Sequence, residues 1–311
     1  MQLLGLLVLS AALLVCVVLG ANNASACVRT STGILSVEYS TLAIVGGLGV
    51  VFGSVIEGGK LSNAIYGGVL ATQNDKTTII ILVATLVVML VATILKLPLS
   101  LTQAMVGTAL PMGLLETGVN WRFLTLVGGS WVATPLVAAT LSIVIYRIVK
   151  RTGGRIGNIF QRARMYAAIT VVASFYVGYA LGANGVGLIY GIARFLVGTV
   201  PFLSLCLSIA AVAGIYLFGY TVTSTVSEKI LALAGAAALA AQVSGALTVH
   251  FFTQIGIPVS ITQAVVGGIV GIGQAKAIVI MNRRMVLRVV FGWIMAPLTG
   301  LVLAWLLLIS M

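Results

Sequence analysis

Long apolar stretches recur along the chain, separated by short polar segments. A helix needs about 20 apolar residues to cross the roughly 30 Å hydrocarbon core of a bilayer. Most of the stretches approach that length, so the pattern predicts an all-α, polytopic membrane protein. The predicted spans cover about residues 2–20, 41–56, 78–95, 123–149, 165–182, 202–219, 230–247 and 286–310.

Four further segments are apolar but interrupted by Gly, Pro, Ser, Thr and Asn: 24–38, 98–117, 184–200 and 258–275. Interrupted backbone is tolerated at membrane depth only where protein buries it or where it lines a wet cavity. The pattern therefore predicts broken or re-entrant helices around an interior site.

One of these interruptions occurs twice. Residues 98–107 (the first box) read PLSLTQAMVG, and residues 258–267 (the second box) read PVSITQAVVG. Seven of the ten positions are identical, and the copies lie 160 residues apart. In each copy a proline precedes a small polar cluster and a Gly-containing apolar run. We expect the cluster to lie at the positive N-terminal end of a buried half-helix, with its free N–H groups directed at an anion.

Other short motifs recur in the same order. Residues 19–22 (LGAN) return as 181–184, and the Trp-Pro motif 131–136 (WVATPL) returns as 293–298 (WIMAPL). Recurrence at a fixed offset is the mark of internal duplication. The sequence therefore predicts two transmembrane repeats, 1–149 and 165–311, joined by a linker at 150–164.

Composition supports the membrane class. The chain is 60% hydrophobic and 7% charged, against about 25% charged residues in soluble domains. Its net charge of +12 is concentrated in the linker 150–164 and in residues 276–288. Basic loops beside apolar spans indicate the cytoplasmic side of a cell membrane rather than nucleic-acid binding.

The loops after the two boxes differ in charge. Glu116 and Arg122 cancel after the first box, whereas the loop after the second box is entirely basic. Because equivalent loops with different bias belong on opposite faces, we predict inverted topology. The count of crossings agrees if the boxes form re-entrant hairpins and if 2–38 and 165–200 fold back at their Asn residues. The basic residues of the second loop are Lys276, Arg283, Arg284 and Arg288.

The candidate substrate-binding groups are neutral hydroxyls and amides at the interruptions. Such groups, with backbone N–H groups, bind an oxyanion without the desolvation cost of a buried cation. The alternative interpretation is that the hydroxyls only satisfy helix backbone, as they do in many membrane helices. The predicted site residues are Asn22, Asn23, Ser100, Thr102, Gln103, Asn184, Ser260, Thr262 and Gln263.

Few ionisable residues fall within the apolar segments. Arg29 and Arg194 are candidates for an anion pathway, with snorkelling to the membrane surface as the alternative. We interpret Glu57 and Lys60 as a structural pair, and His250 as a buried or interfacial histidine rather than a proton carrier.

No enzyme signature is present. The chain has no GK[ST] loop, no ligand cluster for a metal and no paired carboxylates, which argues against an enzyme, an ATP-driven pump or a bound cofactor. The cysteines Cys16, Cys27 and Cys206 form no CxxC, and we expect buried free thiols. Residues 1–26 are not expected to be a cleaved signal peptide, because their first residues carry no basic side chain.

The segments GANNASACVRTSTG, PLSLTQAMVGTALPMG and PVSITQAVVGGIVGIG together resemble the inorganic phosphate transporter (PiT-type) family, which includes sulfate permeases. The resemblance also covers GGKLSNAI at 58–65 and extends over nearly the whole chain. It implies a secondary transporter for a tetrahedral oxyanion, coupled to Na⁺ or H⁺, and it suggests a homodimer. By the same resemblance the substrate and ion site is lined by Asn22, Ser100, Thr102, Ser260 and Thr262.

The sequence departs from that family at two places. Typical phosphate members read Asn-Asp at the first interruption, where this chain has Asn22 and Asn23, and the second repeat has Asn184 followed by Gly185. The family box reads Ser-Thr-Thr-His, where this chain has Gln103 and its counterpart Gln263 at the last position. The carboxylates would be Na⁺ ligands and the histidine a proton acceptor. Their absence leaves the coupling ion open and brings sulfate close to phosphate as the substrate.

Three functions remain open from the sequence. The leading one is a cation-coupled oxyanion transporter that works by alternating access. The second is a passive anion channel or facilitator, because the missing acids allow transport without a coupling ion. The third is a membrane scaffold or sensor descended from a transporter.

Overall fold

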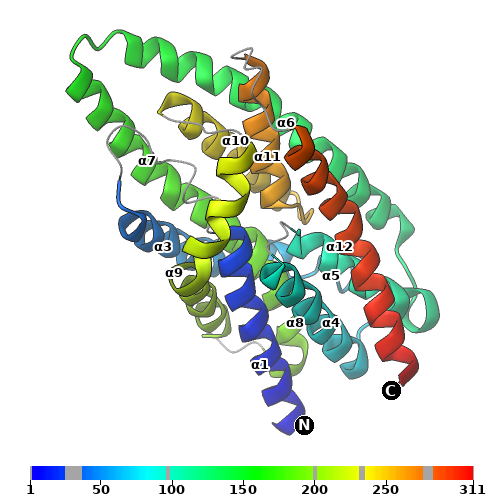
Figure 1. The fold of residues 1–311 in the computed structure, drawn as a ribbon. Helices are drawn as coiled ribbons and strands as arrows, with labels where there is room; N and C mark the ends of the chain where they lie inside the picture. The colour runs from blue at the N-terminus through cyan, green and yellow to red at the C-terminus, as the bar shows by residue number, and fades with distance from the viewer. Residues whose placement is uncertain are drawn as a thin grey trace.

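The computed structural model describes residues 2–24, 37–95, 99–198, 202–230, 235–275 and 283–310. In these segments the chain forms helices joined by short turns (Figure 1). Seven stretches are helical, long and apolar enough to cross a membrane. The predicted all-α, polytopic fold class is therefore confirmed.

The helices are α1 (Gln2–Leu19), η1 (Gly20–Ala24), α3 (Tyr39–Glu57), η2 (Gly58–Leu61), α4 (Asp75–Ile94), α5 (Leu101–Met112), η3 (Gly113–Thr117), α6 (Trp121–Gly154), α7 (Ile159–Leu181), η4 (Gly182–Val186), α8 (Gly187–Val197), α9 (Leu203–Ile230), α10 (Ala236–Gln254), α11 (Ile261–Ala275) and α12 (Arg283–Ser310).

Asparagine side chains define where three long helices begin. The Asn74 side chain accepts a hydrogen bond from the backbone N–H of Thr77 at 2.6 Å, and Asn120 does the same for Phe123 at 3.1 Å. Asn158 caps α7 in the same way. Each cap satisfies one of the N–H groups that lack a partner in the first turn of a helix. These positions are therefore sharp helix starts at the ends of the apolar spans.

Small residues allow the helices to approach closely. A Cβ atom on Gly178 of α7 would lie 1.9 Å from the Gly46 carbonyl oxygen of α3, and one on Gly20 would lie equally close to the backbone of Ala211 in α9. Such small-residue contacts are typical of helix packing in membranes. Large apolar side chains instead cover the outer surface, as Leu3, Val132 and Leu136 do. In a bilayer these side chains contact lipid, so their exposure agrees with the membrane class.

Helices from the two halves of the sequence pack against each other. Helix α5 of the first half packs along α12, and α11 of the second half packs along α6. Both α6 and α12 contain the proline of the Trp-Pro motif within the helix, Pro135 and Pro297. In Figure 1 the linker between α6 and α7 lies at the edge opposite the two chain termini.

Some predicted boundaries are wrong. We predicted that the chain folds back at Asn184, but α7 continues through the π-helical η4 into α8 as one stretch, Ile159–Val197. A π-helical turn widens the backbone locally without reversing it, and Gly and Asn at 182–185 permit that conformation. The equivalent fold in 2–38 lies largely outside the described residues. The span predicted at 230–247 is observed as Ala236–Gln254, because Gly235 with φ +55° begins that helix.

Candidate anion site at the two box helices

Each box forms the N-terminus of a helix, as the sequence indicated. The side chain of Ser100 caps α5 by accepting from the Gln103 N–H at 3.3 Å, and Ser260 accepts from the Gln263 N–H at the same distance. The remaining N–H groups of the first turn have no partner within the helix. The partial positive charge of the helix dipole adds to them. Two helix N-termini suited to an anion are therefore buried inside the protein.

The two boxes meet. The hydroxyl of Thr102 donates to the carbonyl oxygen of Val259 at 3.0 Å, which joins the first box to the second. On the other side the hydroxyls of Ser260 and Thr262 bond each other at 2.7 Å. Residues 157 apart in sequence are thus in direct contact at the ends of α5 and α11.

A small cavity (the box cavity) lies between them. Its volume is only about 10 Å³, which is room for about one water molecule. Its polar groups come from both boxes and from the η4 interruption, so the structure brings part of the predicted site together. The lining residues are Leu19, Ser100, Leu101, Thr102, Leu181, Asn184, Gly185, Val259, Ser260 and Ile261.

The asparagines of the two LGAN motifs make the same contact in each half. The Asn22 amide donates to Thr93 Oγ1 at 3.1 Å, and the Asn184 amide donates to Thr253 Oγ1 at 3.1 Å. Both threonine hydroxyls in turn donate to the carbonyl four residues earlier, at 2.8 Å. Because each hydroxyl proton is already used, the threonine oxygen can only accept, which fixes the amide N–H toward it.

The two threonines were missed by the sequence analysis. A signal was available, because Thr93 and Thr253 each lie five residues before the proline that opens a box. Neither threonine lines the box cavity. They act instead as positioning residues for the amides of Asn22 and Asn184.

Within the described part of the chain, three buried amide oxygens have no hydrogen-bond partner: Asn22 Oδ1, Gln103 Oε1 and Gln263 Oε1. Their residues are at most 3% exposed. A buried acceptor without a donor is costly and rare in folded proteins. These oxygens therefore point to a ligand that supplies positive charge or N–H and O–H donors. The indole N–H groups of Trp131 and Trp293, another matched pair, also lack partners.

The other predicted residues lie apart from the box cavity or outside the described part of the chain. Asn22, Gln103, Thr262 and Gln263 are buried but do not line the cavity, although Thr262 bonds Ser260, which does. The side chain of Asn23 and all of Arg29 and Cys27 fall outside the described residues. Cys16 is a buried free thiol as expected, whereas Cys206 is exposed on the apolar surface.

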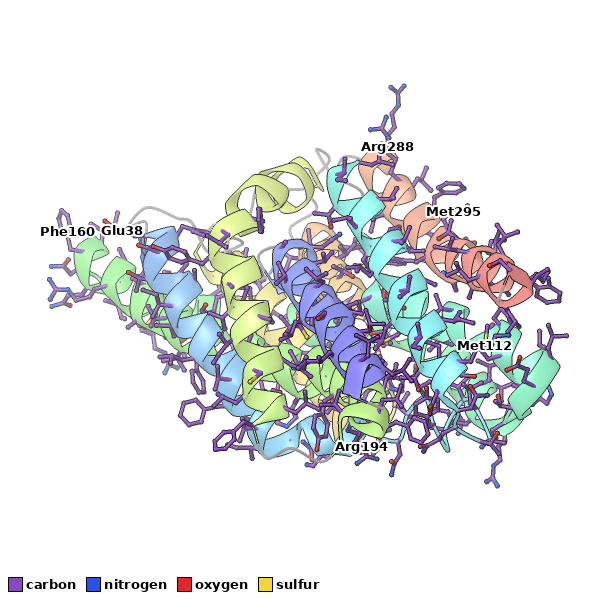
Figure 2. The ribbon with its side chains drawn as sticks, turned by 90° about the horizontal axis from the view of Figure 1, so that it is seen from below. Glu38, Met112, Phe160, Arg194, Arg288 and Met295 are labelled. Atoms are coloured by element: carbon purple, nitrogen blue, oxygen red, sulfur yellow. The ribbon has the colours of Figure 1, made fainter. Side chains whose placement is uncertain are left out.

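Arg194 lies beside a second, wider cavity. Its guanidinium, at the end of α8, donates to the Asn63 side-chain oxygen. Asn63 and Lys60 line a cavity of about 530 Å³ (the wide cavity) together with Tyr66. The Tyr66 hydroxyl bonds Thr78 Oγ1 at 2.6 Å, and burial raises the pKa of Tyr66 to about 12, so it stays protonated. Figure 2 shows Arg194 and Arg288 on opposite edges of the molecule.

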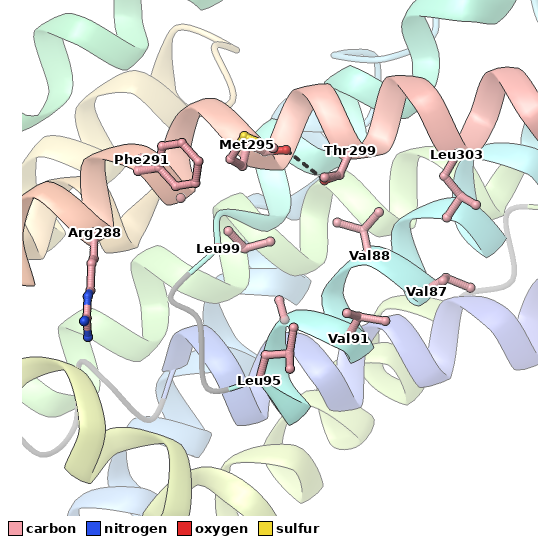
Figure 3. A pocket seen from close by; sticks show the side chains of 12 residues that line it. Val87, Val88, Val91, Leu95, Leu99, Arg288, Phe291, Met295, Thr299 and Leu303 are labelled. Carbon is pink, nitrogen blue, oxygen red and sulfur yellow. Dashed lines mark hydrogen bonds between the residues drawn. The ribbon is translucent and has the colours of Figure 1, made fainter.

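A third cavity is mostly apolar. It is a groove of about 440 Å³ between α4 and α12, lined by apolar side chains such as Leu95, Phe291 and Leu303 and, at one end, by Arg288 (Figure 3). Its one hydroxyl, on Thr299, is already bonded to the Met295 carbonyl oxygen at 2.8 Å. Apart from the Arg288 guanidinium, few groups there could replace the hydration of an anion. The groove contains none of the predicted site residues.

Glycines at the ends of the boxes bring the helices of the two halves together. A Cβ on Gly107 would lie 2.2 Å from the Pro297 carbonyl oxygen, and one on Gly267 would lie 2.3 Å from that of Pro135. The last residue of each box therefore contacts the proline of the Trp-Pro motif from the other half. The same two recurring motifs meet in both places.

Comparison with known proteins agrees with this geometry. A family described as the phosphate transporter family matches residues 19–169 and 158–304. A protein of Methanocaldococcus jannaschii named as a candidate phosphate permease is 28% identical, with 92% of this chain and 91% of that protein covered. The sulfate permease CysP of Bacillus subtilis is 24% identical, with 93% and 83% covered.

The fold has a known counterpart. A solved structure titled as the sodium-dependent phosphate transporter aligns with a TM-score of 0.86 at 20% identity, covering 100% of both chains. At that identity the likeness establishes the fold. The family match, however, spans nearly the entire sequence. The protein therefore belongs to the phosphate transporter family and is a multi-pass protein of the cell membrane.

Proposed function

We propose that this protein is a secondary active transporter of an inorganic oxyanion, coupled to a cation and working by alternating access. One observation carries the proposal: two capped helix N-termini, one from each half of the sequence, meet at a buried cavity lined by neutral donors. Backbone N–H groups and hydroxyls at helix N-termini are suited to a tetrahedral oxyanion. Discontinuous helices that meet between two repeats are typical of secondary transporters.

Phosphate is the first candidate substrate, because the family and most of the relatives named above carry phosphate in their names. Sulfate follows closely. One relative is named a sulfate permease. The residues that line the box cavity include no carboxylate, which could accept a hydrogen bond from the O–H of a protonated phosphate and so favour it over sulfate.

The duplicated contacts support two repeats at 1–149 and 165–311 with opposite orientation. The Ser caps, the Asn–Thr bonds and the Gly–Pro contacts each occur once per half. A pseudo-twofold arrangement explains why all three recur together. Alternating access then consists of one repeat rocking against the other around the boxes.

A coupling cation has candidate ligands. The unpartnered amide oxygens of Asn22, Gln103 and Gln263 are neutral, hard donors of the kind that Na⁺ prefers. They stand at other positions than the missing carboxylates, which correspond to Asn23 and Gly185, but they would supply oxygen ligands in the same region of the sequence. Lys60 and the Arg194 beside Asn63 would attract the anion at the wide cavity.

A passive channel is the second candidate, and the size of the box cavity argues against it. A pore must connect both sides of the membrane, whereas the box cavity has room for about one water molecule. An oxyanion can enter and leave only if the boxes separate, which is the behaviour of a carrier. A scaffold or sensor would need no substrate movement at all.

The test is counterflow in proteoliposomes that contain the purified protein. Vesicles loaded with unlabelled phosphate or sulfate receive a trace of the labelled anion outside, with Na⁺ or a pH gradient supplied separately. A carrier accumulates label transiently above its equilibrium level. A channel only equilibrates it, and a scaffold leaves it outside, so either of those results contradicts the proposal.

A further inference from the structure

A group of titratable side chains lies at the junction of α3, η2, α7 and α10, and no transport step described so far uses it. We name it the His250 cluster: Glu57, Lys60, Tyr176, His250 and Gln254. His250 is the only histidine of the chain. Its Nε2 lies 3.0 Å from Glu57 Oε2, and its Nδ1 lies 2.8 Å from the Tyr176 hydroxyl. Both ring nitrogens are therefore held, by residues from two different helices.

The cluster is a connected network. Glu57 Oε1 accepts from Lys60 Nζ at 3.1 Å, and Glu57 Oε2 also accepts from Gln254 Nε2 at 2.8 Å. Lys60 donates in turn to the Gln254 side-chain oxygen. The side chains of Glu57 and His250 are 16% and 25% exposed. Both side chains are thus mostly buried.

These contacts fix the tautomer that the neutral histidine takes. A carboxylate can only accept, so Nε2 carries the proton, and Nδ1 accepts from the Tyr176 O–H. A second proton can add at Nδ1 if the tyrosine hydroxyl rotates and its oxygen becomes the acceptor. With Glu57 negative and Lys60 positive, the cluster then changes from neutral to a net charge of +1.

Within the described residues the other titratable neighbour is Tyr179, which hydrogen-bonds Glu57, and helix α7 is charged only near its start, at Arg162 and Arg164. Tyr179 packs its ring 5.6 Å from the His250 ring. Helix α11 and η4, which also pack on α10, contain no charged residue. Helix α6 is charged only near its ends, at Arg122 and within 147–151. Protonation of His250 is therefore the event that alters the charge of this region.

The cluster is linked to the anion site through α10. Thr253, which holds the Asn184 amide at the box cavity, lies three residues after His250 and directly before Gln254. One helical turn separates His250 from Thr253, and Thr253 reaches the cavity through the Asn184 side chain. A positive charge on His250 favours an anion at the box cavity, since the intervening protein screens charge weakly.

The first half has no equivalent cluster. At the offset of 160 residues that relates Thr93 to Thr253, the counterparts of His250 and Gln254 are Leu90 and Ile94. The Asn–Thr contact is present in both halves, so it does not need the cluster.

We propose that the His250 cluster is a proton-binding site whose occupancy is linked to oxyanion binding at the box cavity. This inference rests on the proposed transport function. By thermodynamic reciprocity, protonation strengthens anion binding and the bound anion strengthens proton binding by the same factor. Low pH on the side facing the cluster thus promotes loading of the anion.

The first experiment uses the wild-type protein, because one histidine gives one unambiguous signal. Protein labelled with ¹⁵N-histidine is titrated by NMR between about pH 5 and 8, with and without saturating inorganic phosphate. We expect the titration midpoint of His250 to move to higher pH when phosphate is bound. A midpoint that phosphate leaves in place overturns the proposal.

The second experiment measures phosphate affinity across the same pH range in wild type and in His250→Gln. Phosphate changes its own charge in this range, so the readout is the ratio of the two affinities at each pH. We expect the wild type to bind about 5- to 10-fold tighter than the variant at low pH and equally at high pH, within the usual range of coupling. The Glu57→Gln variant should also lose the pH dependence.

Glu116→Gln is the matched control. This variant removes a carboxylate that pairs with Lys76 at 3.8 Å and that lies far from His250 in sequence. Its phosphate affinity should change with pH as that of the wild type does. A ratio for His250→Gln that is flat in pH overturns the proton site and leaves the transport proposal standing. Failure of the wild type to bind phosphate or sulfate at any pH instead contradicts the proposed function, and this inference with it.

Discussion

The two boxes share seven of ten residues, yet their threonines have different partners. Thr102 reaches across to the Val259 carbonyl, whereas Thr262 stays within its own box and bonds Ser260. The Ser caps of the two boxes have the same length, 3.3 Å. Equal local sequences thus make equal local structures, and the difference arises where the halves contact each other. Such a difference is expected if the protein has adopted one of two opposite-facing conformations.

The largest effect is expected from a change at the glycine that ends each box. Gly107→Ala or Gly267→Ala places a methyl group 2.2–2.3 Å from a proline carbonyl oxygen, so the helices must separate. Overpacking of this kind costs about 1–3 kcal/mol or more. We expect the melting temperature in detergent to fall by about 2–5 °C, with transport lost.

Gly128→Ala and Gly129→Ala are the controls for that prediction. Both glycines lie in α6, and nothing lies within 4 Å of an added Cβ. Alanine is favoured over glycine in a helix by about 1 kcal/mol, so these variants should melt at the same temperature or higher. A fall equal to that of Gly107→Ala would show that the close contact with Pro297 is not the cause.

The next effect concerns the substrate. Thr102→Val and Thr262→Val each remove one hydroxyl from the two boxes while keeping the shape of the side chain. A hydrogen bond to a charged group contributes about 1.5–3 kcal/mol, so we expect uptake of the labelled anion at limiting concentration to fall about 10- to 150-fold in either variant. Thr85→Val, which removes a buried hydroxyl bonded to Thr108, is the control. Unchanged uptake in both box variants would count against the site.

Recurrence along the chain predicted much of this site. The Ser caps, the Asn interruptions and the Trp-Pro motifs each appear twice in the sequence, and each pair occupies equivalent places in the structure. A side chain duplicated at a fixed offset is visible without any coordinates. The class of fold followed from apolar length alone, since a bilayer sets that length.

Apart from the duplicated Thr93 and Thr253, what sequence reasoning missed has no copy or no side chain. The acceptor of Thr102 is the backbone carbonyl of Val259, and every residue has one, so no residue type marks it. Glu57 and His250 are 193 residues apart, and neither has a counterpart in the other half, so their contact left no pattern. At Asn184, Gly and Asn indicated a reversal, but the same residues also permit a π-helical turn.

The smallest effect sharpens the comparison between the boxes. If the halves exchange roles in the opposite-facing state, Thr262 should bond the carbonyl of Leu99, which stands 160 residues before Val259, and Thr102 should turn back to Ser100.

The Thr102–Val259 bond then stabilises only the present conformation. A single hydrogen bond contributes about 0.5–1.5 kcal/mol, so Thr102→Val should shift the balance toward the opposite state about 2- to 12-fold. Thr262→Val should shift it the other way. The balance can be read from the rate at which an impermeant thiol reagent modifies Ala71→Cys, an exposed position at the wide cavity, in a background without the native cysteines. Shifts of the same sign in both variants would mean that the two threonines do not exchange roles, and the asymmetry of the boxes would then be permanent.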